Sequence, residues 1–228
     1  MSNIKKITLF IIIIVALIGI AIASIVISKN NEDTVDSTPK KAETSKLSKI
    51  YEKIKENQNF TFSMEEEKEE LKYKVSMLQR GTDACIDVHS DGEHTTTLVL
   101  EKESYYIMHD EEEYYVFADE EVDSDILISG LEEMAQKDYT TGKEEINGKK
   151  YYYEEYDSDG YNFTIFADIN ENSKIKTRFY FDKDQLVYIK NIITENENQE
   201  EEIVKADISY EIDESLFELP ENYAEVEG

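Results

Sequence analysis

The chain has 228 residues and a formal net charge of −28, from 52 Asp and Glu residues against 24 Lys and Arg residues. A surface this acidic repels the phosphates of DNA and RNA, so no nucleic-acid partner is expected. The single cysteine excludes an internal disulfide framework and a multi-cysteine zinc site. Because 40% of the residues are hydrophobic and 11% aromatic, the chain is too apolar to be a disordered acidic tail.

The first predicted element is a membrane segment over Ile7–Ile27, a run of apolar residues with three interruptions. At 1.5 Å of helix rise per residue, the run spans about 30 Å, the thickness of a bilayer core. Lys5 and Lys6 precede it, and no acidic residue occurs before Glu32. The positive-inside rule therefore places the N-terminus in the cytoplasm and the rest of the chain outside a cell membrane crossed once.

Two fates of residues 1–28 stay open. As a signal anchor, the segment stays in the membrane and tethers the chain. As a signal peptide, it is cleaved after Ala23, because Ala21 and Ala23 supply an A-x-A site, and the domain is secreted. The apolar run continues past Ala23 to Ile27, which is longer than the core of a usual signal peptide and favours the anchor.

A polar stalk over residues 29–45 and a helix over 46–56 come next. The stalk is mixed in charge and contains Pro39, which indicates a flexible linker. Thr44 or Ser45 is suited to cap the helix. The apolar residues of the helix share one face: Leu47, Ile50, Tyr51 and Ile54.

From Phe60 onward the apolar period changes from 3.6 to 2, which predicts β-strands. The clearest alternation lies at 71–78 and 204–213. Further strands are predicted at 84–90, 94–102, 104–110, 113–118, 140–146, 149–156, 161–167, 175–181 and 185–194. One stretch, 122–137, returns to helical spacing and interrupts the strands.

Two-residue turns join neighbouring strands. Asn-Gly and Asp-Gly pairs are the strongest hairpin signals, because both turn residues need a positive φ. A turn at Asn147-Gly148 places Ile146 opposite Lys149, and Glu145 opposite Lys150 with opposite charge. Successive hairpins of this kind predict an antiparallel meander.

The predicted fold class is α+β: an N-terminal transmembrane helix and one curved antiparallel β-sheet, a half-barrel, with helices on its concave face. An amphipathic helix must bury its apolar stripe and a sheet must bury one face, so the two are expected to pack together. The sheet domain is predicted to span residues 46–224.

Three stretches carry a resemblance to a known family: NGKKYYYEEY at 147–156, TRFYFDKDQLVYIKNI at 177–192 and the ending SLFELP at 215–220. Together with a helix before the first strand and a mid-chain helix, they resemble the LolA/LppX-like half-barrel superfamily of bacterial lipoprotein and lipid carriers. The resemblance covers roughly residues 45–223. It implies an unclosed, strongly curved sheet whose concave face holds apolar ligands under helices. Many exported relatives are lipoproteins, and this chain lacks the lipidation cysteine.

Few residues are candidates for chemistry. A turn at Asp91-Gly92 places His89 opposite His94 on one face. That pair would allow a weak metal or pH-sensing site, yet two histidines on an exposed hairpin are usually solvated. Cys85 is the only thiol, and His109 beside a turn is interpreted as a surface residue. The chain is therefore predicted to be no enzyme, with no catalytic residue, no metal ligand and no cofactor.

Tyrosines in neighbouring positions on the predicted strands are the remaining candidates, because they put a ring on each side of the sheet. Such rings suit the lining of a groove for an apolar ligand. The ligand-cavity candidates are Tyr73, Val75, Met77, Tyr106, Tyr115, Tyr152, Phe179 and Tyr188.

These features predict a non-enzymatic, membrane-tethered extracytoplasmic binding module that holds a lipid or other apolar ligand in a sheet cavity. The alternative is an acidic protein-interaction module at the cell envelope. Its cavity would be filled by its own helices, and its charge would attract a basic protein partner. An empty groove would favour the first function, and a packed one the second.

Overall fold

The structure, a computed structural model, describes residues 34–41, 44–68, 71–100, 103–118, 126–158, 174–195 and 198–226. Most of these residues lie in β-strands. The strands are β1 (Thr34–Lys40), β2 (Asn59–Lys68), β3 (Leu71–Arg80), β4 (Asp83–Ser90), β5 (Glu93–Leu100), β6 (Glu103–Met108), β7 (Glu113–Ala118), β8 (Tyr139–Ile146), β9 (Lys149–Asp157), β10 (Lys174–Asp182), β11 (Gln185–Glu195), β12 (Asn198–Ser209) and β13 (Ala224–Glu225). The helices are α2 (Lys46–Asn57), α3 (Ile126–Gln136) and the 3₁₀ helix η2 (Glu214–Phe217).

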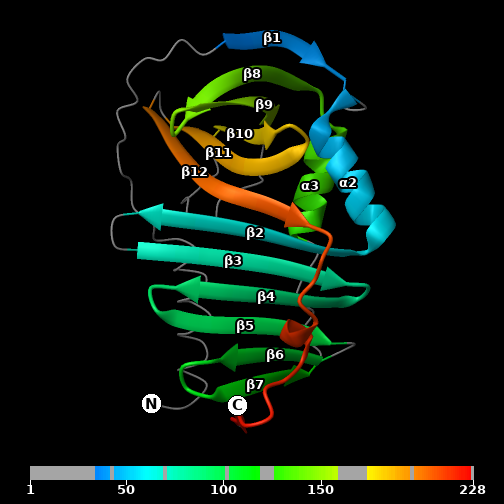
Figure 1. The fold of residues 1–228 in the computed structure, drawn as a ribbon, viewed down its shortest axis with the longest axis vertical. Coiled ribbons are helices and arrows are strands. Elements are labelled where there is room, and N and C mark those ends of the chain that lie inside the picture. The colour runs from blue at the N-terminus through cyan, green and yellow to red at the C-terminus, as the bar shows by residue number, and fades with distance from the viewer. Residues whose placement is uncertain are drawn as a thin grey trace. The chain divides into compact units, whose positions relative to one another are not determined.

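The strands are hydrogen-bonded in the order β1-β8-β9-β10-β11-β12-β2-β3-β4-β5-β6-β7-β13 (Figure 1). The order has two different ends, β1 and β13, so the sheet is not closed. Sequential hairpins such as β3–β4 and β8–β9 are antiparallel. The final pair, β7 with β13, is parallel, and the sheet is therefore mixed.

This architecture corrects the predicted fold class. The described residues form mostly a single large mixed sheet of 13 strands, with only two short α-helices. The predicted half-barrel, antiparallel throughout and with helices on its concave face, is wrong. Alternation with a period of 2 identifies strands and turn chemistry identifies their neighbours, but neither determines how strongly a sheet curves or what covers its faces.

Several predicted elements are confirmed. α2 begins directly after Ser45, whose Oγ accepts a hydrogen bond from the N–H of Ser48 at 2.8 Å. At the turn Asn147-Gly148 the φ angles are +51° and +79°, and the flanking strands pair in the predicted register. α3 lies within the predicted helix at 122–137. The strand predicted at 161–167 lies outside the described residues.

In the described part of the chain, no helix is long and apolar enough to cross a membrane. This finding corrects the predicted transmembrane helix and the single-pass membrane location. A long apolar run meets the length requirement of a membrane helix, but length alone does not establish one. The run Ile7–Ile27 and the cleavage site after Ala23 lie outside the described residues. Within the predicted stalk 29–45, Thr34–Lys40 forms strand β1 and pairs with β8.

The chain divides into two compact units. The first consists of Met1–Tyr51 and Leu127–Val204, and the second of Glu52–Ile126 and Lys205–Gly228. Strand β12 continues from the first unit into the second. Each unit has its own buried side chains.

Aromatic rings fill the first unit. On one side of β9 and β10, Tyr156 packs edge-on against Phe179 with ring centroids 5.7 Å apart. On the other side, the rings of Tyr153 and Tyr180 lie 5.5 Å apart. All four side chains are buried. The tyrosine-rich sequence of β9 therefore packs on both sides of this part of the sheet.

The start of α2 is fixed by a buried carboxylate on β9. Glu154 accepts the backbone N–H groups of Lys46 at 2.8 Å and Leu47 at 3.1 Å. The hydroxyls of Tyr152 and Tyr156 donate to the same carboxylate at 3.4 and 3.1 Å. Burial raises the pKa of Glu154, and these four donors offset part of that effect. A negative group at this position is favourable because the N-terminus of a helix is electropositive.

An ion-pair network covers Tyr153. Arg178 donates from Nε to Glu155 at 2.8 Å and from Nη1 to Glu144 at 2.7 Å, and its guanidinium lies 4.4 Å from the ring centroid of Tyr153. Lys190 also donates to Glu144. Burial alone would raise the pKa of Glu144, but its hydrogen bonds and the two cations hold that pKa below its usual range.

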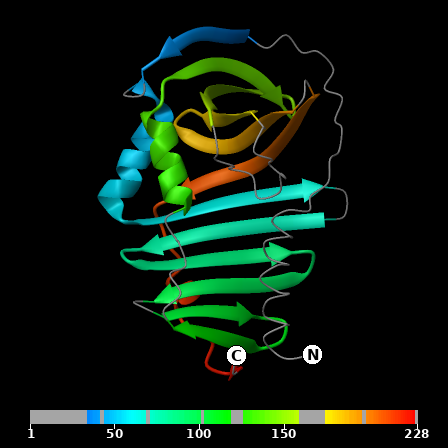
Figure 2. The same ribbon diagram turned by 180° about the vertical axis from the view of Figure 1, so that it is seen from behind.

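In the second unit, the C-terminal segment crosses the strands β4 to β7 and covers an apolar cluster (Figures 1 and 2). The buried members of this cluster are Leu78, Cys85, Leu98, Ile107 and Phe217. Arg80 stacks on Phe217 at 4.3 Å and donates to Glu214 at 2.8 Å, so it holds η2 in place. Burial raises the pKa of the Cys85 thiol to about 12, which makes it an unreactive core residue.

Gly142 lies directly against the ring of Tyr153. A Cβ atom added at Gly142 would lie 2.4 Å from Cζ of that ring, which Arg178 and Tyr180 hold in place. We predict that Gly142→Ala lowers the free energy of unfolding by about 1–3 kcal/mol. Lys143→Ala, at the exposed next residue, should change it by less than about 0.5 kcal/mol. Urea unfolding measures both, and equal stabilities would contradict the predicted clash.

Glu144→Gln tests the ion-pair network. Because the folded-state pKa of Glu144 is lowered, its contribution to stability is present above its unfolded-state pKa and lost as the pH falls through its folded-state pKa. At about pH 7 the variant should lose about 3 kcal/mol of unfolding free energy, since Arg178 and Lys190 lose their shared partner. The difference should shrink towards about pH 3. In a urea titration, Glu145→Gln, at an exposed residue, should match the wild type at both pH values.

Candidate functional site

The three histidines of the chain come together in the second unit. The predicted two-residue turn pairs His89 with His94, and the same register places Asp87 opposite Thr96. Residues two apart on a strand share a face, so Asp87 and Thr96 lie beside the histidine pair. His109 directly follows β6, and its backbone N–H donates to the carbonyl of His94 at 3.0 Å. Neighbouring strands therefore bring all five side chains to one place.

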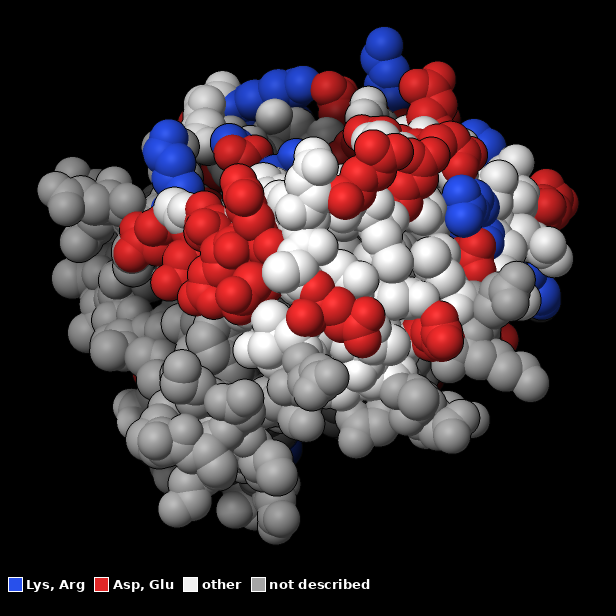
Figure 3. All heavy atoms as spheres, turned by 90° about the horizontal axis from the view of Figure 1, so that it is seen from below, with Lys and Arg blue, Asp and Glu red and all other residues white. Residues whose placement is uncertain are grey.

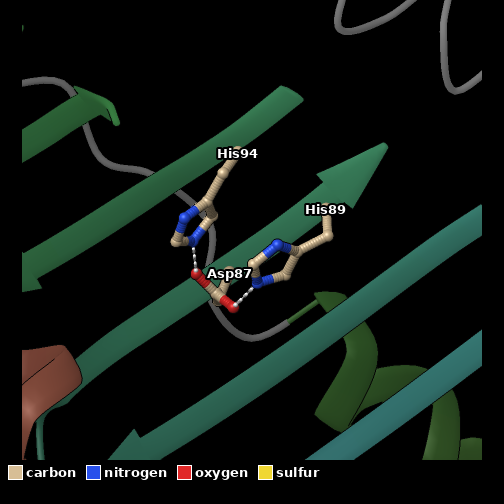
Figure 4. Close-up of side chains that lie close together, drawn as sticks. All are labelled: Asp87, His89 and His94. Atoms are coloured by element: carbon tan, nitrogen blue, oxygen red, sulfur yellow. Dashed lines mark hydrogen bonds and ion pairs between the residues drawn. The ribbon is translucent and has the colours of Figure 1, made fainter. Parts of the chain in front are cut away.

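Asp87 is the centre of this arrangement (Figure 4). Its Oδ1 lies 2.7 Å from Nε2 of His94 and accepts the hydroxyl of Thr96 at 2.9 Å. Its Oδ2 lies 3.1 Å from Nε2 of His89. The Asp87 side chain is only 8% exposed, so these partners replace water around the carboxylate. We call Asp87, His89 and His94 the Asp87 site.

The imidazole rings form a stack. The centroids of His89 and His94 lie 3.9 Å apart with an interplanar angle of 17°, and those of His94 and His109 lie 3.7 Å apart at 12°. At the end of the stack, the ring of Tyr223 stands edge-on to His109 at 5.6 Å. The stack thus connects the Asp87 site to the C-terminal segment.

The hydrogen bonds assign the protons in this cluster. Burial would raise the pKa of Asp87, but hydrogen bonds from His94 and Thr96 and the nearby imidazoles hold it below its usual range. An ionised carboxylate only accepts, so the Nε2 atoms of His89 and His94 donate to it. The Thr96 hydroxyl donates its single proton to Asp87, and its oxygen therefore accepts from Nε2 of His109.

The protons of His109 and Tyr223, at the end of the stack, are assigned in the same way. Burial, and then the neighbouring His94, lowers the pKa of His109, which favours the neutral ring. A neutral ring that donates from Nε2 has an unprotonated Nδ1. That nitrogen lies 3.1 Å from the hydroxyl of Tyr223 and accepts its proton. A continuous chain of hydrogen bonds therefore runs from Tyr223 through His109 and Thr96 to Asp87.

The Asp87 site has the donor atoms of a metal centre. Its two imidazole nitrogens and its carboxylate oxygen lie within 4.8 Å of one another. Two histidines and one carboxylate are the protein ligands of Zn²⁺ sites that keep an open position and of non-haem Fe(II) sites. A bound ion would take the place of the two Nε2 protons, and each ring would carry its proton on Nδ1. The Thr96 hydroxyl would keep Asp87 oriented, as partners of ligating carboxylates do.

The eight residues predicted to line a cavity are divided between the two units. Tyr73, Val75, Met77, Tyr106 and Tyr115 lie in the second unit, and Tyr152, Phe179 and Tyr188 in the first. In the second unit they lie on the face opposite to the histidines, because Met77 pairs with Ile86 and not with Asp87. In the first unit, Tyr188 pairs with Tyr180, which is the neighbour of Phe179 on β10. Because adjacent residues of a strand point to opposite faces, Tyr188 and Phe179 lie on opposite faces of the sheet. That these residues line a cavity for an apolar ligand stays a prediction.

Sequence reasoning found the pair His89 and His94 but assigned it no metal, and it missed Asp87 and Thr96. The available signal was the spacing Asp87-x-His89 and His94-x-Thr96 around the turn, since residues two apart on paired strands share a face. His109 was interpreted as a surface residue, and the structure places it against His94. Its position depends on the pairing of β5 with β6, which the spacing around one turn does not show.

In comparisons with known proteins, no family model matches the chain, and no curated protein is significantly similar to it. The resemblance to the LolA/LppX-like superfamily therefore stays a prediction. Any function has to be argued from the geometry of the Asp87 site.

Replacing Asp87 tests its role as the anchor of the cluster. Asp87→Ala removes the acceptor of His89, His94 and Thr96, so we predict a loss of about 1–3 kcal/mol of unfolding free energy in metal-free buffer. Glu93→Ala, at an exposed acidic residue of β5, should cost less than about 0.5 kcal/mol. Both values come from urea unfolding with chelator present. A cost for Asp87→Ala no larger than that for Glu93→Ala would show that the cluster is only a solvated surface.

Proposed function

We propose that this protein binds one divalent transition-metal ion, of the class of Zn²⁺, Ni²⁺ or Cu²⁺, through Asp87, His89 and His94. The observation that carries the proposal is the convergence of two imidazole nitrogens on one buried carboxylate, with all ligand atoms within 4.8 Å. Imidazole ligands select these ions over Mg²⁺ and Ca²⁺, which prefer all-oxygen sites. The proposed ligand is therefore a metal ion, whereas the sequence predicted a lipid or other apolar ligand.

The site is suited to reversible binding. The side chains of His89 and His94 are 48% and 29% exposed, so an ion held by them would keep positions that face solvent. Structural zinc sites are closed by four protein ligands, whereas sites with three protein ligands hold water or an exchangeable group in the remaining position. We therefore assign the site to capture and release of the ion and not to holding the fold together.

The charge of the protein supports this assignment. The chain carries a net charge of −28, and Figure 3 shows Asp and Glu side chains gathered in patches on the face seen there. A strongly negative surface raises the local concentration of cations and speeds their association. The acidic surface would attract any cation, and the imidazoles would provide the selectivity.

Titration of the full-length chain with Zn²⁺, Ni²⁺, Mg²⁺ and Ca²⁺ tests the proposal. Native mass spectrometry and calorimetry should show one bound Zn²⁺ or Ni²⁺ per chain. His94→Gln should weaken that binding at least about tenfold, because the ion loses one of three ligands. Circular dichroism confirms that the variant is folded.

The matched control is Glu112→Gln, which removes one exposed negative charge from the turn between β6 and β7. It should leave the affinity for Zn²⁺ within about twofold, as expected for a single exposed charge. Tight binding that survives in His94→Gln, or Ca²⁺ binding as strong as Zn²⁺ binding, would assign the ion to carboxylates elsewhere and overturn the proposal.

A further inference from the structure

The C-terminal segment is held on the second unit by contacts that differ in strength. Phe217 is buried in the apolar cluster, and Tyr223 packs against the same cluster while half-buried. Next to Tyr223 lies the two-residue strand β13, whose side chains Ala224 and Glu225 are exposed. The attachment of β13 to the second unit thus depends on Tyr223 and on backbone pairing.

That backbone pairing is short. The N–H of Ala224 donates to the carbonyl of Glu112 at 2.9 Å, and the N–H of Val226 donates to the carbonyl of Tyr114 at 2.9 Å. Exposed backbone hydrogen bonds of a two-residue strand open with a small free energy. The docking of β13 on β7 is therefore an equilibrium that a modest change nearby can shift.

Tyr223 connects this equilibrium to the Asp87 site. Its hydroxyl donates to Nδ1 of His109 at 3.1 Å, and its ring stands edge-on to the same imidazole. His109 in turn stacks on His94 at 3.7 Å and donates to Thr96, which is bonded to Asp87. One proposed metal ligand, His94, is thus stacked on the ring that Tyr223 contacts, and a second, Asp87, is bonded to the Thr96 hydroxyl that the same ring donates to.

A bound ion would fix the orientation of the His94 ring and of the Asp87 carboxylate. His109 would then stack on an oriented His94 ring and donate from Nε2 to the Thr96 hydroxyl. Its Nδ1 would be held towards Tyr223. Once the metal ion has ordered these side chains, docking of Tyr223 no longer has to order them. Metal binding and docking therefore favour each other.

We infer that Tyr223 is a positioning residue of the metal site, and that metal binding and docking of strand β13 strengthen each other. This inference rests on the proposed function. Linkage requires the two effects to be equal: the factor by which docking raises metal affinity is the factor by which metal raises the docking equilibrium constant. The fraction of chains in which β13 is docked on β7 would then rise when the site binds a metal ion.

The test is hydrogen–deuterium exchange of the full-length chain with and without Zn²⁺. The C-terminal peptide that contains the amides of Ala224 and Val226 should exchange about fivefold more slowly with Zn²⁺ bound. Tyr223→Phe keeps the ring and removes the hydroxyl, which lies 3.1 Å from Nδ1 of His109 and 3.5 Å from the backbone carbonyl of the same residue. It should lose about fivefold in Zn²⁺ affinity, and Zn²⁺ should no longer slow the exchange of its C-terminal peptide.

Tyr105→Phe is the matched control, because Tyr105 packs against the same apolar cluster and its hydroxyl donates to Glu103. It should keep both the wild-type affinity and the effect of Zn²⁺ on exchange. If Zn²⁺ binds the wild type but leaves exchange of the C-terminal peptide unchanged, the coupling is overturned and the metal site stands. Wild-type affinity in Tyr223→Phe would overturn the coupling as well. If Zn²⁺ does not bind the wild type, both proposals fail.

Discussion

The buried carboxylate of Asp87 is the constraint on which the arrangement of the histidines depends. An ionised group that is almost fully removed from water must be surrounded by donors, or it destabilises the fold. Here the donors are the side chains on its own strand and on the neighbouring one, and they can reach it only in the register that the Asp91-Gly92 turn sets. The φ angles of +54° and +92° at that turn are available to this pair of residue types and to few others.

The buried carboxylates of Asp87 and Glu154 and the partly buried carboxylate of Glu144 are satisfied in three different ways, and the differences indicate their roles. Glu154 is held by backbone N–H groups and hydroxyls, which position a helix. Glu144 is held by Arg178 and Lys190, fixed cations that leave no position for another ligand. Asp87 is held by imidazoles, whose donating nitrogens become acceptors when they lose a proton. Among these partners, imidazoles are the ones that exchange a proton for a metal ion most readily near neutral pH, so the donors around Asp87 support the proposed binding site.

The sequence was sufficient for local structure and insufficient for the assembly of distant parts. Helical spacing identified α2, and Asn-Gly and Asp-Gly turns identified two hairpins with their register, because these signals act within about ten residues. The parallel pairing of β13 with β7 and the packing of Tyr223 on His109 join residues more than one hundred positions apart. No periodicity encodes such contacts, and the fold class failed for the same reason.

The acidity and the histidine stack have separate effects on one chain. The Asp and Glu side chains gather in patches on the face seen in Figure 3, and such patches would attract cations without choosing among them. The proposed selectivity among cations resides in one buried carboxylate and the two imidazoles beside it. A third imidazole links them to the C-terminal segment. Since salt screens exposed carboxylates far more than the buried carboxylate of Asp87, changing the ionic strength should alter the rate at which an ion arrives far more than the identity of the ion that is retained.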